Sequence, residues 1–158
     1  MYFEVFYSRV KAIVILLVGV FHSQAFILGW YNSENESNNP VFLILGIIIF
    51  VSVLLFFINV MTFMVKISGD KITVRDGLRK RYEFQILDIK SVKLNLPIKS
   101  TRLKRIIIET ETDYFDIDSG MKGYKTMAGY LLEQYADGKI RQSAMSVRTI
   151  SNLELQLQ

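Results

Sequence analysis

The sequence contains no cysteine and only one histidine, and both shortages limit the chemistry available to the chain. Without cysteine there are no disulfides, thiolate metal sites or thiol nucleophiles. The one histidine, His22, lies inside a hydrophobic stretch, which excludes a serine, histidine and acid triad in the polar part of the chain. A glycine-rich phosphate loop is also lacking. We therefore predict that the protein is not an enzyme and uses no cofactor.

Acidic residues gather in one region but do not form a metal-binding pattern. They are Glu109, Glu111, Asp113, Asp116 and Asp118. Their spacing does not match the calcium loop, in which ligands alternate before a glycine and a distant glutamate. Alternating charges on a strand and its turn are typical of a solvated face. We predict no metal site.

Two hydrophobic stretches dominate the first 65 residues, at 12–31 and 41–65. A hydrocarbon core of ~30 Å requires about 20 helical residues. Both stretches reach that length, and neither contains Asp, Glu, Lys or Arg. Only nine residues, rich in turn formers, separate them, so the sequence predicts an antiparallel transmembrane hairpin over residues 1–65.

The cations that flank the stretches predict the orientation of the hairpin. Arg9 and Lys11 precede the first stretch, Lys66 and further cations follow the second, and the loop at 32–40 carries only acidic charges. Lys and Arg near span ends are retained in the cytoplasm. We expect an integral membrane protein with cytoplasmic termini and an external loop.

Aromatic residues support these span boundaries, because they are common at the level of the lipid headgroups. They are Tyr2, Phe3, Phe6 and Tyr7 before the first span and Trp30 and Tyr31 at its end. An alternative makes residues 1–25 a cleaved signal peptide. We favour the span, because the apolar sequence continues from Ala25 to full span length.

Polar residues interrupt both predicted spans near their middle: His22, Ser23 and Gln24 in the first and Ser52 in the second. Polar groups at this depth are costly and usually find partners. Histidine is the side chain whose unperturbed pKa lies near neutrality, so His22 would suit a proton or ion relay. We favour hydrogen bonding within the hairpin or to another subunit, because two helices are too few to enclose a pathway.

The remaining 93 residues begin without a linker and first show the period-2 pattern of half-buried antiparallel strands. Four or five strands are evident, at 71–75, 79–86, 89–96, 105–110 and 114–118. From Met121 to Tyr135 the period becomes about 3.6, which predicts an amphipathic helix capped by Asp118 or Ser119. Residues 138–158 are predicted to be a loosely ordered tail, or a short segment that becomes ordered on a partner. The fold class is therefore a membrane α-helical hairpin plus an α+β module at 66–137.

Two sequence segments of this module carry a family resemblance. They are Ile67-Ser-Gly-Asp-Lys-Ile-Thr-Val-Arg-Asp-Gly and Tyr82-Glu-Phe-Gln-Ile-Leu-Asp-Ile-Lys-Ser-Val-Lys-Leu. With two preceding spans, this order resembles bacterial membrane proteins that carry a pleckstrin-homology-like (PH-like) domain. The resemblance implies a curved antiparallel sheet capped by a C-terminal helix on the cytoplasmic face. The chain differs from a full PH domain in having fewer evident strands and no Trp in the final helix, and no phosphoinositide specificity is carried over.

Cations are concentrated in the first part of the module: residues 66–105 hold twelve Lys or Arg against four Asp or Glu. The candidate binding residues are Arg79, Lys80, Arg81, Lys99, Arg102, Lys104 and Arg105. Each cation near an anionic leaflet contributes about 1 kcal/mol. Solubility and topology explain the same cluster equally well. We expect no nucleic-acid binding, because aromatics do not interleave with the cations.

These observations favour a module that binds a protein partner, anionic lipid headgroups, or both. The alternative is an accessory or protective, immunity-like subunit of a larger membrane assembly, with the hairpin as its interface. An oligomeric channel or transporter that depends on His22 is the third interpretation. The predicted partners are therefore membrane lipids and either another protein or further copies of the chain.

Overall fold

The computed structural model describes residues 1–31, 40–77, 80–96 and 103–157, except for the side chain of Lys80. These residues form two compact units. One unit is Ser8–Thr62, and the other combines Met1–Tyr7 with Phe63–Gln158. The helical unit is thus inserted into the sheet unit, whereas the sequence predicted a division into residues 1–65, 66–137 and 138–158. The predicted external loop lies almost entirely outside the described residues.

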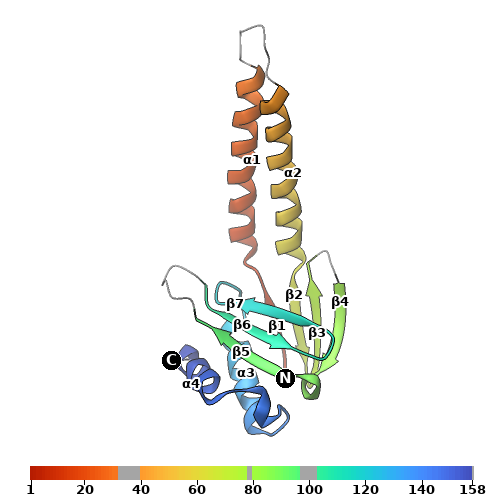
Figure 1. Cartoon of the computed structure of the whole chain (residues 1–158), viewed down its shortest axis with the longest axis vertical. Helices are drawn as coiled ribbons and strands as arrows, with labels where there is room; N and C mark the ends of the chain where they lie inside the picture. Colours follow the sequence, from red (N-terminus) through yellow and green to blue (C-terminus); the bar gives the residue numbers. More distant parts are fainter. Residues whose placement is uncertain (32–39, 78–79, 97–102, 158) are drawn as a thin grey trace. The chain divides into compact units, whose positions relative to one another are not determined.

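The helical unit is a hairpin of α1 (Arg9–Tyr31) and α2 (Pro40–Thr62) (Figure 1). Both helices are long and apolar enough to cross a membrane, and most of their surface is exposed in the isolated chain. The second helix ends at Thr62 and not at residue 65 as predicted, because residues 64–68 pair as a strand. Apolar residues of that strand simply continue the hydrophobic run of the helix.

Small residues let the two helices approach each other closely. A Cβ atom added to Gly19 would lie 2.5 Å from Val53 Cγ1, and one added to Gly46 would lie 2.8 Å from Ile27 Cγ1. The added Gly46 atom would also lie 3.3 Å from the Ser23 carbonyl oxygen. Close backbone approach at small residues is a common means of packing helices in membranes.

The first sheet of the other unit has the order β1-β2-β3-β4, and all its neighbours are antiparallel. Its strands are β1 (Tyr2–Phe6), β2 (Met64–Ser68), β3 (Lys71–Asp76) and β4 (Lys80–Gln85). The first strand corrects an expectation: the aromatics around Tyr2 to Phe6 belong to a strand that pairs with β2, and Val5 is fully buried. The long hairpin between β1 and β2 hides this pairing from a local reading of the sequence.

The second sheet has the order β5-β6-β7, again antiparallel, with β5 (Ser91–Asn95), β6 (Arg105–Glu109) and β7 (Tyr114–Asp118). A short helix, η1 (Ile86–Asp88), connects the two sheets. Seven strands are therefore described, and the prediction of four or five was too low. Buried side chains from both sheets form one hydrophobic core with α3.

The helix α3 (Tyr124–Ala136) follows the second sheet and buries Met127, Ala128 and Leu131. Its N-cap is Gly123, which has a φ of 83°, and no side chain caps it. Asp118, the predicted cap, is instead buried and accepts hydrogen bonds from the Tyr7 hydroxyl and the Gly120 amide, both at 2.9 Å.

Residues beyond α3 are ordered, in contrast to the loosely ordered tail that the sequence predicted. They form η2 (Gln142–Ala144) and α4 (Val147–Leu157), and Met145 makes a parallel bridge to Val92 at the edge of β5. Ile140, Met145 and Leu153 are almost fully buried. These buried apolar residues form the core-facing side of the segment, which covers β5 and α3 (Figure 1).

Candidate functional site

The predicted basic residues that the structure describes do not lie in one cluster. Arg79, Lys99 and Arg102 lie outside the described residues, as does the side chain of Lys80. Arg81 lies at the start of β4, whereas Lys104 and Arg105 lie at the start of β6. Figure 1 shows these two strand starts at opposite edges of the sheet unit. The described residues of the predicted basic set therefore lie at two separate places on the sheet unit.

Both cations at the start of β6 have partners within the protein. The Arg105 guanidinium lies 3.3 Å from the Asp116 carboxylate. The Lys104 ammonium donates to the Gln156 side-chain oxygen at 2.7 Å, which ties β6 to α4. These contacts indicate a structural role for this end of the predicted cluster.

A different set of residues emerges from the strand register of the first sheet. Phe6 pairs with Met64, Met64 with Arg75, and Arg75 with Arg81. Directly paired residues project to the same face of a sheet. The neighbouring row of Val5, Val65, Val74 and Tyr82 faces the core, so this row faces outward.

Lys122 extends the row beyond β1. Its backbone exchanges hydrogen bonds with Phe6 at 2.9 and 3.2 Å, and its ammonium lies 6.0 Å from the centre of the Phe6 ring. We call the five residues Lys122, Phe6, Met64, Arg75 and Arg81 the outer row. It combines three cations with two half-buried apolar side chains.

The cations of the outer row have few acidic partners among the described residues, in contrast to five other cations of this unit. Ion pairs hold Lys71 to Glu83, Lys90 to Glu111, Lys93 to Glu109, Arg105 to Asp116 and Lys139 to Asp70. Within the described residues, Arg75 and Lys122 have no such pair. Arg81 reaches Glu83 only at 3.4 Å, and its side chain is 72% exposed.

Glu83 neutralises Arg81 incompletely because Lys71 is its main partner. The hydrogen bond from Lys71 is the largest cause that lowers the pKa of Glu83, and the charge of Arg81 contributes less. Arg75 and Arg81 therefore face each other across the two strands with little compensating charge. Like charges directly opposite each other destabilise a sheet, so this arrangement is not explained by folding.

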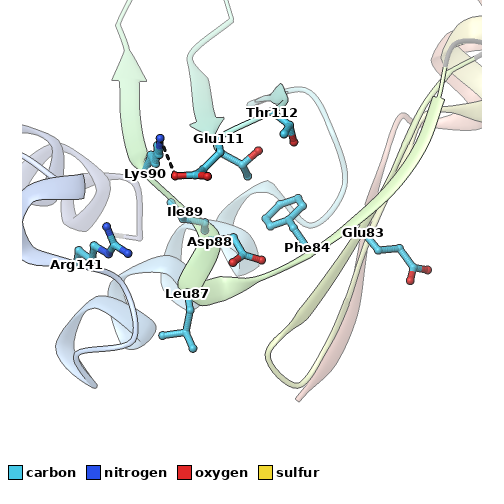
Figure 2. A pocket seen from close by; sticks show the side chains of 10 residues that line it. Glu83, Phe84, Leu87, Asp88, Ile89, Lys90, Glu111, Thr112 and Arg141 are labelled. Atoms are coloured by element: carbon cyan, nitrogen blue, oxygen red, sulfur yellow. Dashed lines mark ion pairs between the residues drawn. The ribbon is translucent and has the colours of Figure 1, made fainter.

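A pocket with a volume of about 460 Å³ lies beside η1 (Figure 2). Its lining mixes both signs of charge: Glu83, Asp88 and Glu111 are acidic, and Lys90 and Arg141 are basic. Lys90 and Glu111 pair at 2.9 Å, which lowers the pKa of Glu111. The three acidic and two basic side chains of the lining nearly cancel, so the pocket does not favour a simple ion of either sign.

A second pocket, of about 340 Å³, is lined by Asp76, Tyr82, Asp113 and Asp116 among others. Burial and these carboxylates raise the pKa of Tyr82 well above its usual value. The acidic lining disfavours anions. No group of three or more His, Asp or Glu residues suited to a metal ion occurs among the described residues.

His22 and Ser23 each bond to a carbonyl of their own helix. Ser23 faces α2, but its hydroxyl donates to the Val20 carbonyl of its own helix at 2.8 Å. The His22 ring bonds to the Val18 carbonyl at 2.7 Å. His22, Gln24 and Ser52 are exposed on the outside of the isolated hairpin. These three side chains are thus available to a neighbour.

Comparisons of the chain with protein-family models, curated proteins and solved structures found no match. The function is therefore argued from the surface features themselves. Sequence reasoning missed Arg75 and Lys122 as members of a site, because only strand register brings them beside Arg81. The basic composition of residues 66–105 was the one signal that pointed toward this surface.

Proposed function

We propose that the chain is a non-enzymatic protein of the bacterial inner membrane, with cytoplasmic termini, whose PH-like module binds anionic lipid headgroups through the outer row. The two apolar helices support membrane insertion. Sheets of four and three antiparallel strands followed by a helix support the PH-like architecture that the sequence resembles.

The observation that carries the proposal is the direct pairing of Arg75 with Arg81 without an ion-pair partner for Arg75 among the described residues. Two guanidinium groups on neighbouring strands suit a phosphate, because arginine donates several hydrogen bonds in a planar fork. Lys122 adds a third cation along the same row, and Phe6 and Met64 add apolar surface. Such a mixture of cations and apolar groups is typical of surfaces that contact a membrane interface.

The position of the outer row in the chain favours a membrane as the source of the phosphate. Only Phe63 separates the last residue of α2 from Met64, and only Tyr7 and Ser8 separate Phe6 from the first residue of α1. Both strands at the start of the row therefore join directly to candidate membrane spans. We therefore expect the phosphate to come from the headgroups of anionic lipids.

Three cations near an anionic leaflet contribute about 3 kcal/mol, at about 1 kcal/mol each. Reversing two of them should therefore weaken contact with headgroups by at least ~30-fold. High salt should have a similar effect on the wild type, because the screening length falls to ~3 Å at 1 M.

The test uses the full chain in liposomes with and without phosphatidylglycerol. Because the protein lacks cysteine, a polarity-sensitive dye on a single cysteine at Thr73 reports on the face that carries the outer row. We expect a response to phosphatidylglycerol that disappears in Arg75→Glu/Arg81→Glu and at high salt.

The matched control is Lys93→Glu/Arg105→Glu, which changes the net charge equally but alters cations that already have acidic partners. It should respond like the wild type. If both double variants lost the response, the response would depend on net charge alone. That result would contradict a binding site at the outer row.

A second candidate function is that of an accessory subunit that meets another membrane protein through the hairpin. The outward exposure of His22, Gln24 and Ser52 favours it. Purification in mild detergent that always yields this chain alone would count against a different protein as partner.

A further inference from the structure

Two polar side chains lie on opposite flanks of α1 near its middle. Ser23, between them, is 1% exposed and faces α2. Successive residues of an α-helix are rotated by about 100°. His22 and Gln24 therefore each lie about 100° from the direction of α2, one on each side. Both are exposed in the isolated chain.

The two flanks offer complementary hydrogen-bonding groups. Nδ1 of His22 lies 2.7 Å from the Val18 carbonyl oxygen, which only accepts, so Nδ1 carries the proton. In the neutral ring, Nε2 is then an acceptor that points away from the helix. The Gln24 amide has two N–H donors, and its side chain has no hydrogen bond within the described residues. One flank thus presents an acceptor, and the other presents donors.

Both side chains lie at a depth in the bilayer where a hydrogen-bond donor or acceptor without a partner is costly. His22 and Gln24 are two and four residues beyond Val20, the central residue of α1, which corresponds to about 3 and 6 Å along the helix. The hydrocarbon core extends about 15 Å on each side of its midplane. Polar groups at such depth usually have a protein partner. This step rests on the membrane insertion that the proposed function includes.

We propose that hairpins of this chain associate head to tail in the membrane, with the Gln24 amide of one copy donating to His22 Nε2 of the next. A second copy satisfies both flanks with a single type of contact, because the two residues differ in depth by only about 3 Å. A two-fold contact centred on the His22 flank would place acceptor against acceptor. One centred on the Gln24 flank would pair the two amides but leave both His22 acceptors without a donor. Repetition of a head-to-tail contact closes a ring when the rotation permits.

Disulfide cross-linking tests the geometry, since the chain has no cysteine of its own. Ile15 and Leu17 lie seven residues before His22 and Gln24, share their flanks and are exposed. Chains with Ile15→Cys and chains with Leu17→Cys, distinguished by a size tag, are co-expressed and oxidised in membranes. We expect dimers that contain one chain of each kind, and little product from either variant alone.

Self-cross-linking of Ile15→Cys or Leu17→Cys at the same level would indicate two-fold contacts and overturn the proposal. So would the absence of dimers, or cross-linking only to a different protein.

The hydrogen bond is tested by substitutions in the same cysteine background. His22→Leu and Gln24→Leu should each lower the yield of mixed dimers about three- to thirty-fold, the range expected for a hydrogen bond between membrane helices. Ser23→Ala is the matched control, since Ser23 faces α2 and bonds within its own helix. Equal yields in all three variants would overturn the His22–Gln24 contact.

Extraction with alkaline carbonate separates this proposal from the insertion on which it depends. The leucine variants are more apolar and should resist extraction as the wild type does. Release of the wild type would sink both proposals, whereas resistant protein without mixed dimers would sink only the head-to-tail association.

Discussion

Replacement of Gly123 by alanine tests the least expected part of the fold, the placement of β1 against the start of α3. Gly123 has a φ of 83°, which costs a non-glycine residue about 1–2 kcal/mol. A Cβ atom there would also lie 2.5 Å from the Glu4 carbonyl oxygen and 3.2 Å from Val5 Cγ2. Both of these atoms belong to β1, so the substitution pushes directly against that strand.

The steric part adds to the conformational part. Overpacking of this kind costs about 1–3 kcal/mol, and a shift of β1 would weaken the two backbone hydrogen bonds between Phe6 and Lys122. We therefore expect Gly123→Ala to destabilise the sheet unit by about 2–5 kcal/mol. In a unit of this size, each kcal/mol lowers the melting temperature by about 4–8 °C.

Two other glycines provide matched controls. Gly69 and Gly138 have φ values of 61° and 74°, but an added Cβ atom would meet nothing within 4 Å. Gly69→Ala and Gly138→Ala should therefore show only the cost of about 1–2 kcal/mol for the backbone conformation. The difference between Gly123 and these controls isolates the contact with β1.

The assay is thermal unfolding in mild detergent, followed by the near-ultraviolet circular dichroism of tyrosine. The only tryptophan, Trp30, lies in α1 and does not report on the sheet unit. If Gly123→Ala melts within the range of the two control variants, β1 does not pack against residue 123 and its place in the first sheet is wrong.

Three further predictions concern the sheet unit. Leu153→Ala should destabilise this unit by about 2–5 kcal/mol, because Leu153 is fully buried. Leu155→Ala alters a side chain that is 61% exposed and should change the melting temperature little. Equal effects of the two substitutions would contradict the packing of α4. Burial raises the pKa of Tyr130 from 10.0 to about 12. Its contribution to the stability of the fold is therefore present below pH 10 and is lost as pH rises through 12. Ultraviolet titration that shows every tyrosine ionising near its usual pKa would refute this prediction. Lys93 lowers the pKa of Glu109 below 4.5. The stabilisation that this pair provides is therefore present above pH 4.5 and is lost as pH falls through the lowered pKa. Glu109→Gln should flatten that part of the acid unfolding profile, and an unchanged profile would exclude the pair as a contributor to stability.

Local periodicity predicted the elements that are continuous in the sequence. The strands around Ile72, Phe84, Ile107 and Phe115 and the helix around Met127 show their burial pattern within a few residues. The absence of charge over two long runs predicted two helices of membrane-spanning length. Each of these predictions depends on a repeat that neighbouring residues contain.

Pairing between distant segments could not be predicted in this way. Phe6 pairs with Met64 across the whole hairpin, and the apolar residues of β2 are indistinguishable in composition from the end of the preceding helix. The C-terminal segment is polar on average, yet Leu153 is buried because α3 and β5 supply its contacts. In both cases the energy that orders the segment comes from residues far along the chain.

The candidate site shows the same division. The sequence by itself determined that residues 66–105 are strongly basic, that the spans contain polar residues near their middle and that cysteine chemistry is absent. Only the tertiary structure decided that Arg75 lies opposite Arg81 with Lys122 on the same row, because register is set by pairing between strands. Only the packing of α1 on α2 decided that Ser23 turns inward while His22 and Gln24 face out, because composition does not specify which side of a helix meets its neighbour.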